Sequence, residues 1–175
     1  DVYTEGITKI TAEDIYYAKE FGYVIKLVGI AKVDEGKIEV KVHPMLIPNH
    51  HPLASVRDSF NAVFIHGDAC DDAMFMGRGA GKMPTASAVM GDAITVVRNI
   101  LHDNCGWNGG LAYKKMPVKK IEETKGRFFL RLHVSEKPGT LANIASVMGN
   151  NDVMIDQVYS KYTKDGAQEL VITTG

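Results

Sequence analysis

The most specific pattern in the sequence is a glycine-rich segment, residues 74–88, that joins a strand-like run to the start of a helix. Its glycines, Gly77, Gly79 and Gly81, occupy alternate positions. Because glycine has no side chain, main chain of this kind can come close to a flat or phosphorylated ligand, and the unpaired N–H groups of the following helix favour an anion. The segment therefore suits a cofactor, although glycines at a strand-to-helix turn are structural at least as often.

The segment matches neither of the common phosphate-binding patterns. A P-loop has a longer spacing between its first glycine and the Gly-Lys pair, and it has Ser or Thr where Met83 stands here. The dinucleotide-binding fingerprint requires a glycine where Lys82 stands, within a βαβ unit that the neighbouring sequence does not predict. The glycines thus indicate a close approach of main chain to a ligand without identifying the ligand.

A second candidate site lies in the segment Ser135–Leu141, which joins a predicted strand to a predicted helix. It places backbone donors at the helix N-terminus, where a small carboxylate can dock. An ordinary strand-to-helix turn explains the same residues equally well.

Other residue types that often carry chemistry lack the spacing they would need. The histidines considered as metal ligands show no His-x-x-x-His or Cys pairing; they are His43, His50, His51 and His66. The clustered carboxylates Asp68, Asp71 and Asp72 are typical of a hairpin turn. Neither Cys70 nor Ser87 has a base nearby in the pattern that covalent catalysis uses. We expect no metal site and assign no catalytic residue from these groups.

Composition limits the class of protein. The chain has 175 residues, of which 45% are hydrophobic and 23% charged, with 20 basic and 21 acidic side chains. These values are typical of one large or two small folded domains, and the near-zero net charge argues against a nucleic-acid partner. No apolar run approaches the roughly 20 residues that span a bilayer. Two cysteines are too few for a disulfide framework, and no signal pattern begins the chain, so we expect a cytoplasmic protein with no membrane partner.

The ends of the chain lack the usual features of a complete protein. It begins at Asp1 without Met and ends on a strand-like run at Gly175, so we expect it to be part of a longer protein.

Residues 1–101 predict an α+β unit whose order is helix, hairpin, hairpin, helix. Thr11 can cap the first helix together with Asp14, and Gly22 can end it. The predicted hairpins are 24–33 with 37–43 and, after a loop punctuated by Pro44, Pro48 and Pro52, 61–66 with 73–76.

The last element of this unit is a helix, 84–101, whose apolar residues recur every three or four positions and predict one buried stripe. The unit is expected to form a mixed sheet with helices on one face. Residues 102–126 then lose this periodicity and are rich in Asn, Gly and Lys, which predicts a linker. Glu122 and Glu123 interrupt its lysines, so a solvated connector is a better interpretation than a polyanion site.

Residues 127–175 predict a second module with the order βαββ. The strand 127–134 alternates an apolar face with a mostly polar one, a helix follows from Leu141 to Met148, and 153–159 with 168–174 predict two more strands around a turn at 164–166. A ferredoxin-like βαββαβ module needs one more helix and one more strand. The module is therefore expected to be incomplete, or completed by a partner.

Several motifs together resemble the bacterial homoserine dehydrogenase family. Residues 1–101 carry them in order: the opening DVYTEGIT, IEVKVHP with LIP and HPLA, and GRGAG with PTASA. Residues 127–174, with Lys137-Pro-Gly-Thr-Leu and Asn150-Asn-Asp-Val-Met-Ile, resemble an ACT domain, an amino-acid-sensing module. Glu136 stands where such loops more often have Asp.

The resemblance implies an oxidoreductase that interconverts aspartate 4-semialdehyde and homoserine with NAD or NADP, on the route to threonine and methionine. It implies that the Rossmann domain and the catalytic Lys/Asp segment precede residue 1, so the chain alone is expected to be inactive. Of the cofactor contacts, Gly81 is carried over first, with Gly79 and Gly77 shaping the turn. In the ACT-like part, Pro138, Gly139, Thr140 and Leu141 are the expected effector contacts, with threonine as one candidate effector.

The sequence also allows interpretations other than a dehydrogenase fragment. The chain could be a stand-alone amino-acid-sensing regulatory protein, which binding of threonine without affinity for NADPH would favour. An RNA-recognition module is disfavoured, because the strands lack the aromatic run that stacks bases. Open strand edges in an incomplete module favour pairing with another copy, so we expect a homodimer or a higher homo-oligomer.

Overall fold

The computed structural model of the chain describes residues 2–104, 115–135, 137–162 and 168–175. Short helices and several small sheets alternate along this chain, which confirms the α+β fold class. By internal contacts the chain divides into two units, Asp1–Pro48 with Pro117–Gly175, and Asn49–Met116.

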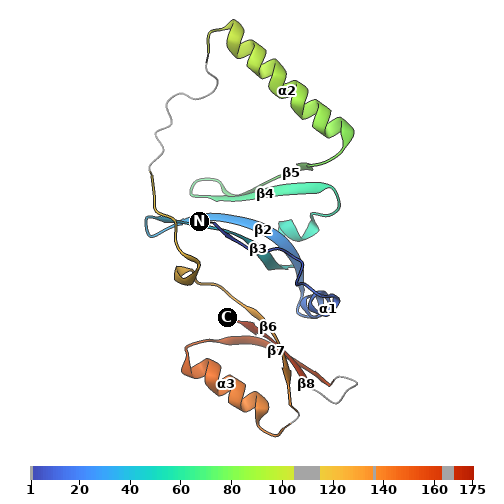
Figure 1. Ribbon diagram of the computed structural model, residues 1–175, viewed down its shortest axis with the longest axis vertical. Helices are drawn as coiled ribbons and strands as arrows, with labels where there is room; N and C mark the ends of the chain where they lie inside the picture. Colours follow the sequence, from blue (N-terminus) through green and yellow to red (C-terminus); the bar gives the residue numbers. More distant parts are fainter. Residues whose placement is uncertain (1, 105–114, 136, 163–167) are drawn as a thin grey trace. The chain divides into compact units, whose positions relative to one another are not determined.

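The first unit contains a mixed sheet with the strand order β1-β3-β2 (Figure 1). β2 (Tyr23–Asp34) and β3 (Lys37–Pro48) form a long antiparallel hairpin, and β1 (Tyr3–Thr4) pairs in parallel with β3. The predicted turn is confirmed: Glu35 and Gly36 both have positive φ, which a tight hairpin turn requires.

Helix α1 (Ala12–Glu20) precedes this hairpin and begins at the predicted cap. The Asp14 amide donates to Thr11 Oγ1 at 3.3 Å, and the Thr11 amide donates to Asp14 Oδ2 at 2.8 Å. This reciprocal pair is a capping box. Gly22 follows the helix with φ of 81°, a conformation that favours glycine. Start and stop were thus both predicted from local sequence.

The predicted loop at Pro44 and Pro48 is wrong, because both prolines lie inside β3. Proline has no N–H to donate, so it fits a strand only where one side is unpaired. Among the described residues, β1 pairs only with Lys41 and Val42, and β3 has no strand on that side from Pro44 onward. The prolines therefore occupy an edge of β3.

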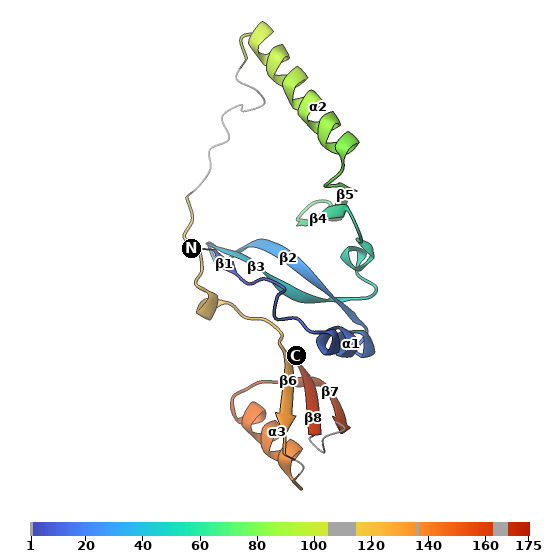
Figure 2. The same ribbon diagram turned by 45° about the vertical axis from the view of Figure 1, so that its right-hand side comes forward.

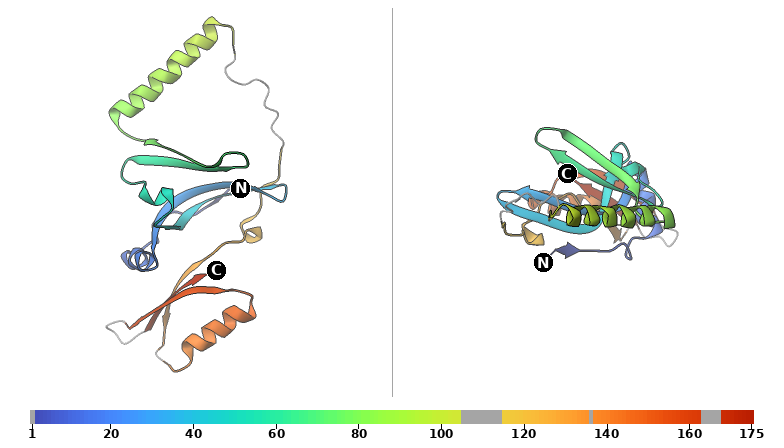
Figure 3. Two further views of the ribbon diagram at one scale, coloured as in Figure 1. Left: turned by 180° about the vertical axis from the view of Figure 1, so that it is seen from behind. Right: turned by 90° about the horizontal axis from the view of Figure 1, so that it is seen from above.

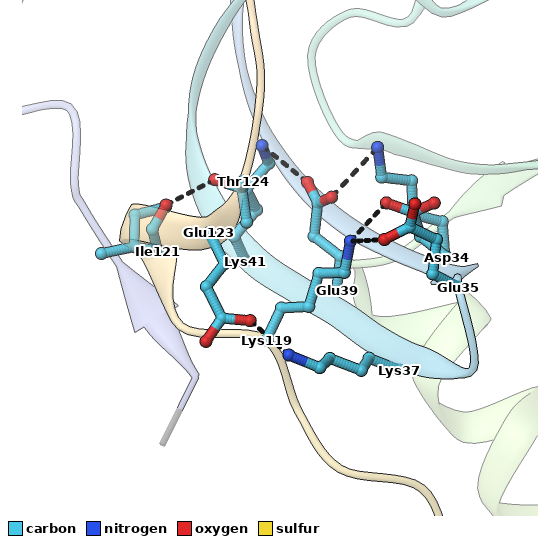
Figure 4. Close-up of polar contacts among 10 residues, drawn as sticks. Asp34, Glu35, Lys37, Glu39, Lys41, Lys119, Ile121, Glu123 and Thr124 are labelled. Atoms are coloured by element: carbon cyan, nitrogen blue, oxygen red, sulfur yellow. Dashed lines mark hydrogen bonds and ion pairs between the residues drawn. The ribbon is translucent and has the colours of Figure 1, made fainter.

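Segment 117–124 lies along β3 and is held there by main chain and by charge (Figure 4). The Ile38 amide donates to Pro117 O and the Lys119 amide donates to Ile38 O, both at 2.8 Å. Lys119 Nζ donates to Asp34 Oδ2 at 2.6 Å, and a short 3₁₀ turn, Ile121–Glu123, follows. This part of the predicted linker is docked on the sheet.

Beside this segment, β2 and β3 bury a carboxylate, Glu39, which is 2% exposed. Lys32 Nζ lies 3.0 Å from its Oε2, and Lys41 Nζ lies 2.8 Å from its Oε1 (Figure 4). Burial alone would raise the pKa of Glu39, but hydrogen bonds from Lys41 and Lys32 outweigh it and hold the pKa below the usual value.

The same unit contains a C-terminal sheet with the strand order β6-β8-β7 and one helix (Figure 2). Its elements are β6 (Phe129–Val134), α3 (Thr140–Asn150), β7 (Ile155–Tyr162) and β8 (Gln168–Thr174). The order βαββ is as predicted, while the predicted turn at 164–166 lies outside the described residues. The middle strand, β8, is buried along most of its length.

The second unit consists of a 3₁₀ turn, Pro52–Ser55, an antiparallel hairpin of β4 (Phe60–Gly67) and β5 (Asp71–Arg78), and α2 (Lys82–Leu101) (Figure 3). The predicted buried stripe of α2 is wrong for this unit as described, because no residue of α2 is buried. Its apolar side chains are exposed instead, among them Met90 at 59% and Ile100 at 72%.

Candidate functional site

Of the three predicted cofactor glycines, Gly77 lies near the end of β5, and Gly79 and Gly81 lie in the short connection from β5 to α2 (Figure 3). All three are exposed. Gly77 pairs with Asn61 of β4, and the Gly79 amide donates to Ser59 O at 3.0 Å. Gly81 is the residue from which α2 begins. The segment is therefore anchored to β4 on one side and leads directly into a helix on the other.

The three positions need glycine to different degrees. At Gly81 the backbone has φ of 126° and ψ of 150°, which side chains rarely allow. At Gly79 a Cβ would lie 1.5 Å from Asn61 Nδ2, so a larger residue requires Asn61 to move. At Gly77 no described atom lies within 4 Å of a Cβ. The local fold explains Gly79 and Gly81 and leaves Gly77 unexplained.

The start of α2 offers donors to an anion. The Thr85 amide donates to Gly81 O, Pro84 has no N–H, and none of the hydrogen bonds among the described residues uses the amide of Lys82 or Met83. These two exposed amides lie at the positive end of a 20-residue helix. The residues present fit a phosphate or diphosphate group, such as a nicotinamide dinucleotide carries.

The second predicted site lies at the start of α3. Pro138, Gly139, Thr140 and Leu141 line a cavity of about 700 Å³, together with Tyr162 of β7 and Gln168 of β8. Gly139 is in the left-handed region with φ of 88°, and none of the hydrogen bonds among the described residues uses the Leu141 or Ala142 amide. Glu136, which the sequence placed in this loop, lies outside the described residues.

Three of the four histidines considered as metal ligands have contacts within the protein. His43 Nδ1 lies 2.8 Å from Pro44 O, His51 Nδ1 accepts the Leu53 amide, and His66 Nδ1 lies 2.8 Å from Asp72 Oδ1. In the part of the chain that the structure describes, no three His, Cys, Asp or Glu residues come together as a metal site would require.

None of the helices within the described ranges combines the length and the apolar character that a membrane span needs.

Sequence reasoning missed a buried polar contact between α1 and the C-terminal sheet. The Tyr17 hydroxyl donates to Glu169 Oε2, and both residues are buried, at 3% and 5% exposed. Burial and this hydrogen bond raise the pKa of Tyr17 well above its usual range, so the hydroxyl stays a donor. Arg131 Nε lies 3.1 Å from Asp14 Oδ1. The mostly polar face predicted for the strand at 127–134 was the only signal, and it does not indicate which segment it contacts.

A second cavity of similar volume, about 710 Å³, also lies in the first unit. Residues of β2, β3, β6 and segment 121–128 line it, including Tyr23, Lys41, Phe129 and Arg131. No local pattern in the sequence indicates this cavity, because its walls come from segments far apart in the chain.

Comparison with known proteins places these features in a family. A family model described as homoserine dehydrogenase matches residues 1–94. Homoserine dehydrogenases of Bacillus subtilis and Corynebacterium glutamicum are 41% and 40% identical to this chain over 99% of its length. The chain spans 41% and 40% of the length of these two relatives.

Solved structures give the same result. A homoserine dehydrogenase from Thiobacillus denitrificans is 37% identical with a TM-score of 0.87, over 99% of this chain and 40% of that one. One from S. aureus, determined at pH 7.5, is 30% identical with a TM-score of 0.67, over 98% of this chain and 41% of that one. The chain belongs to the homoserine dehydrogenase family, as its motifs indicated.

Proposed function

We propose that the protein containing this chain is an NAD(P)-dependent homoserine dehydrogenase of the cytoplasm, acting in threonine and methionine biosynthesis. It would interconvert L-aspartate 4-semialdehyde and L-homoserine. The observation that carries this proposal is the 41% identity to the Bacillus subtilis enzyme over 99% of the chain. The same observation disfavours a stand-alone amino-acid sensor, because the similarity includes the whole glycine segment.

The described residues would contribute to cofactor binding in this protein. The nicotinamide, when bound, supplies the hydride chemistry. Gly81 positions the start of α2, the amides of Lys82 and Met83 donate to a phosphate, and Gly77 and Gly79 let main chain lie close to the cofactor. By family resemblance the catalytic lysine and aspartate precede residue 1, so the 175-residue chain alone is expected to be inactive.

The full-length protein allows a direct test of this proposal. Oxidation of NADPH by aspartate 4-semialdehyde would be followed by absorbance, first for the wild type and then for Gly77→Ala, which the fold tolerates because no described atom lies near the new Cβ. A raised cofactor KM with unchanged thermal stability would support contact at Gly77. Gly91→Ala, inside α2 with equal free space, is the matched control. An unchanged cofactor KM in Gly77→Ala would remove this residue from the site.

The C-terminal residues 127–175 are proposed to be an incomplete ACT-type module, joined by the linker 102–126 to the catalytic portion 1–101. The βαββ order, the sheet order β6-β8-β7 and the cavity at Pro138–Leu141 support this proposal. The cavity volume of about 700 Å³ is ample for a small molecule such as an amino acid.

Threonine is the effector to try first, measured by calorimetric titration of the full-length protein. Leu141 lines the cavity, so Leu141→Ala is expected to weaken threonine binding. Val147→Ala is the matched control, because Val147 lies on the same helix, is 62% exposed and does not line the cavity. Equal affinities of both variants would place the effector elsewhere.

We also propose that the protein is a homodimer or a higher homo-oligomer. The apolar side chains of α2 are exposed in the second unit, and exposed apolar patches of this kind mark interaction surfaces. Light scattering of the full-length protein would show the assembly. A stable monomer at high concentration would contradict the proposal.

A further inference from the structure

Helix α1 contacts the C-terminal sheet through one continuous set of side chains, here called the α1–sheet interface. It consists of Asp14 and Tyr17 on α1 with Phe21 directly after it, and of Arg131, Tyr159 and Glu169 on β6, β7 and β8. In both Figure 1 and Figure 2, α1 lies beside this sheet. Helix α1 and Phe21 thus contact all three described strands of the sheet.

The register of the strands explains why these side chains meet. Arg131 and Tyr159 both pair with Val171, and their neighbour Glu169 is two residues before Val171 on β8, so the three project from the same face of the sheet. Along α1 and the residue directly after it, Asp14, Tyr17 and Phe21 are separated by three and four positions, which places them on one helix face. The side chains on one face of α1 therefore pack against the side chains on one face of the sheet.

Charge makes the interface specific. Glu169 is 5% exposed; it accepts the Tyr17 hydroxyl at Oε2, while Oε1 lies 3.7 Å from Arg131 Nη1. Arg131 in turn contacts Asp14. A shift of α1 that removes the Tyr17 hydroxyl while Glu169 stays buried would leave this carboxylate without that donor, which is costly in a low-dielectric interior. The interface is therefore expected to move as one piece.

Aromatic contacts add packing to this polar centre. The Tyr159 ring lies 5.4 Å from that of Tyr17 and 6.5 Å from that of Phe21, measured between centroids. Both distances are within the range in which aromatic pairs attract. Any shift of β7 is thus transmitted to both the middle and the end of α1.

Both ends of α1 are tied to other elements. At its start, Asp14 uses Oδ2 for the capping box and Oδ1 for Arg131, so the cap and the C-terminal sheet share one carboxylate. At its end, only Phe21 and Gly22 separate the helix from β2. β2 pairs with β3 over its whole length. A displacement of α1 is therefore expected to displace β2 and, with it, the β1-β3-β2 sheet.

We propose that α1 is the coupling element between the C-terminal module and the catalytic portion, and that Glu169 and Tyr17 connect the two. This inference rests on the proposed regulatory function of that module. A second connection exists, because segment 117–124 is docked on β3 by main-chain hydrogen bonds to Ile38 and on β2 by the hydrogen bond from Lys119 to Asp34. The experiment must distinguish the two routes.

The test uses the full-length protein with L-threonine as the probe. Threonine binding is measured by calorimetry, inhibition by the rate of NADPH oxidation, and local opening by hydrogen–deuterium exchange of residues 12–21. Allosteric coupling of the usual size changes affinity by about 5- to 150-fold. In Tyr17→Phe we expect threonine to bind with the wild-type affinity. The factor by which bound threonine inhibits NADPH oxidation should fall toward one.

Two control variants accompany it. Tyr16→Phe alters the neighbouring tyrosine, which is 45% exposed and whose hydroxyl hydrogen-bonds to Tyr159 and not to Glu169, so coupling should persist if Glu169 and Tyr17 carry it. Asp34→Asn weakens the docked segment and should also leave most of the coupling intact. Undiminished inhibition in Tyr17→Phe, or its loss only in Asp34→Asn, would overturn the inference.

If the wild type does not bind threonine, the proposed effector is wrong, and the coupling is then judged without any effector. Glu169→Gln should increase exchange in residues 12–21 of α1 as well as in β8. Exchange that rises in β8 alone would show that the two elements are independent and would overturn the inference.

Discussion

The α-helices of the described residues begin in two different ways. α1 carries its own cap, in which Thr11 and Asp14 hydrogen-bond reciprocally. α2 and α3 begin at Gly81 and Gly139, which have positive φ and no side chain with which to cap. The two helices with uncapped starts are those for which the sequence predicts ligands, whereas α1 contacts other parts of the protein.

The difference has a physical meaning. A capping side chain typically contributes about 1 kcal/mol, because it satisfies amides that the helix itself leaves unpaired. A helix start without a cap forgoes this contribution and keeps the amides free for an acceptor from outside. We interpret the glycine starts of α2 and α3 as a loss of stability that a bound anion offsets. Four substitutions in the full-length protein test this interpretation.

Gly81→Ala is expected to have the largest effect. It should lower the free energy of unfolding by about 1–3 kcal/mol, because its φ of 126° and ψ of 150° lie in a region that is essentially restricted to glycine. The new Cβ would also lie 3.3 Å from Pro84 Cδ. Urea unfolding measures the loss, and the cofactor KM should rise with it. The control Gly91→Ala should instead stabilise α2 by about 0.5–1 kcal/mol. A Gly81→Ala protein as stable as the wild type would contradict the expected strain.

Gly139→Ala should have the next largest effect. Residue 139 has φ of 88° and ψ of −4°, and the left-handed conformation costs an ordinary residue about 1–2 kcal/mol. Gly139→Asn should lose less, because Asn enters this conformation more readily than Ala. Thermal unfolding of both variants provides the comparison. Equal losses would mean that contacts in the cavity, and not the backbone conformation, select glycine here.

Thr11→Ala removes the side-chain acceptor at the start of α1 and should cost about 1 kcal/mol. Because this cap holds the fold and is not at a ligand site, the affinities for cofactor and for threonine should stay unchanged. Thr11→Ser retains the hydroxyl and should restore most of the stability. A changed cofactor KM in Thr11→Ala would contradict the interpretation that the capped start of α1 serves the fold and that only the uncapped starts serve ligands.

Local sequence was sufficient for features that depend on neighbouring residues. The Thr11–Asp14 cap, the Gly22 stop and the bounds of β8 were all predicted, because each depends on residues a few positions apart. The contact between Tyr17 and Glu169 joins residues 152 positions apart, and nothing in either segment specifies the other.

Two further features escaped prediction for the same reason. Pro44 was interpreted as a loop signal, because only the short pairing of β1 shows that this side of β3 is an edge. The glycine segment was identified from its spacing, but spacing did not distinguish Gly79, which faces Asn61 across the hairpin, from Gly77, which faces no described atom. The sequence therefore located the candidate site without separating fold from ligand contact.

Gly79→Ala addresses that separation, and its expected effect on stability is similar to that of Thr11→Ala and smaller than those of Gly81→Ala and Gly139→Ala. Asn61 must turn away from the new Cβ, and an unfavourable rotamer costs about 0.5–1.5 kcal/mol. Asn61→Ala removes the obstacle, so the double variant should regain the stability of Asn61→Ala alone. If its cofactor KM stays raised, Gly79 is needed for the approach of main chain to the cofactor, as the uncapped start of α2 implies. If stability and cofactor KM recover together, Gly79 serves the hairpin only, and the ligand contacts must be assigned to Gly77, Gly81 and the α2 amides.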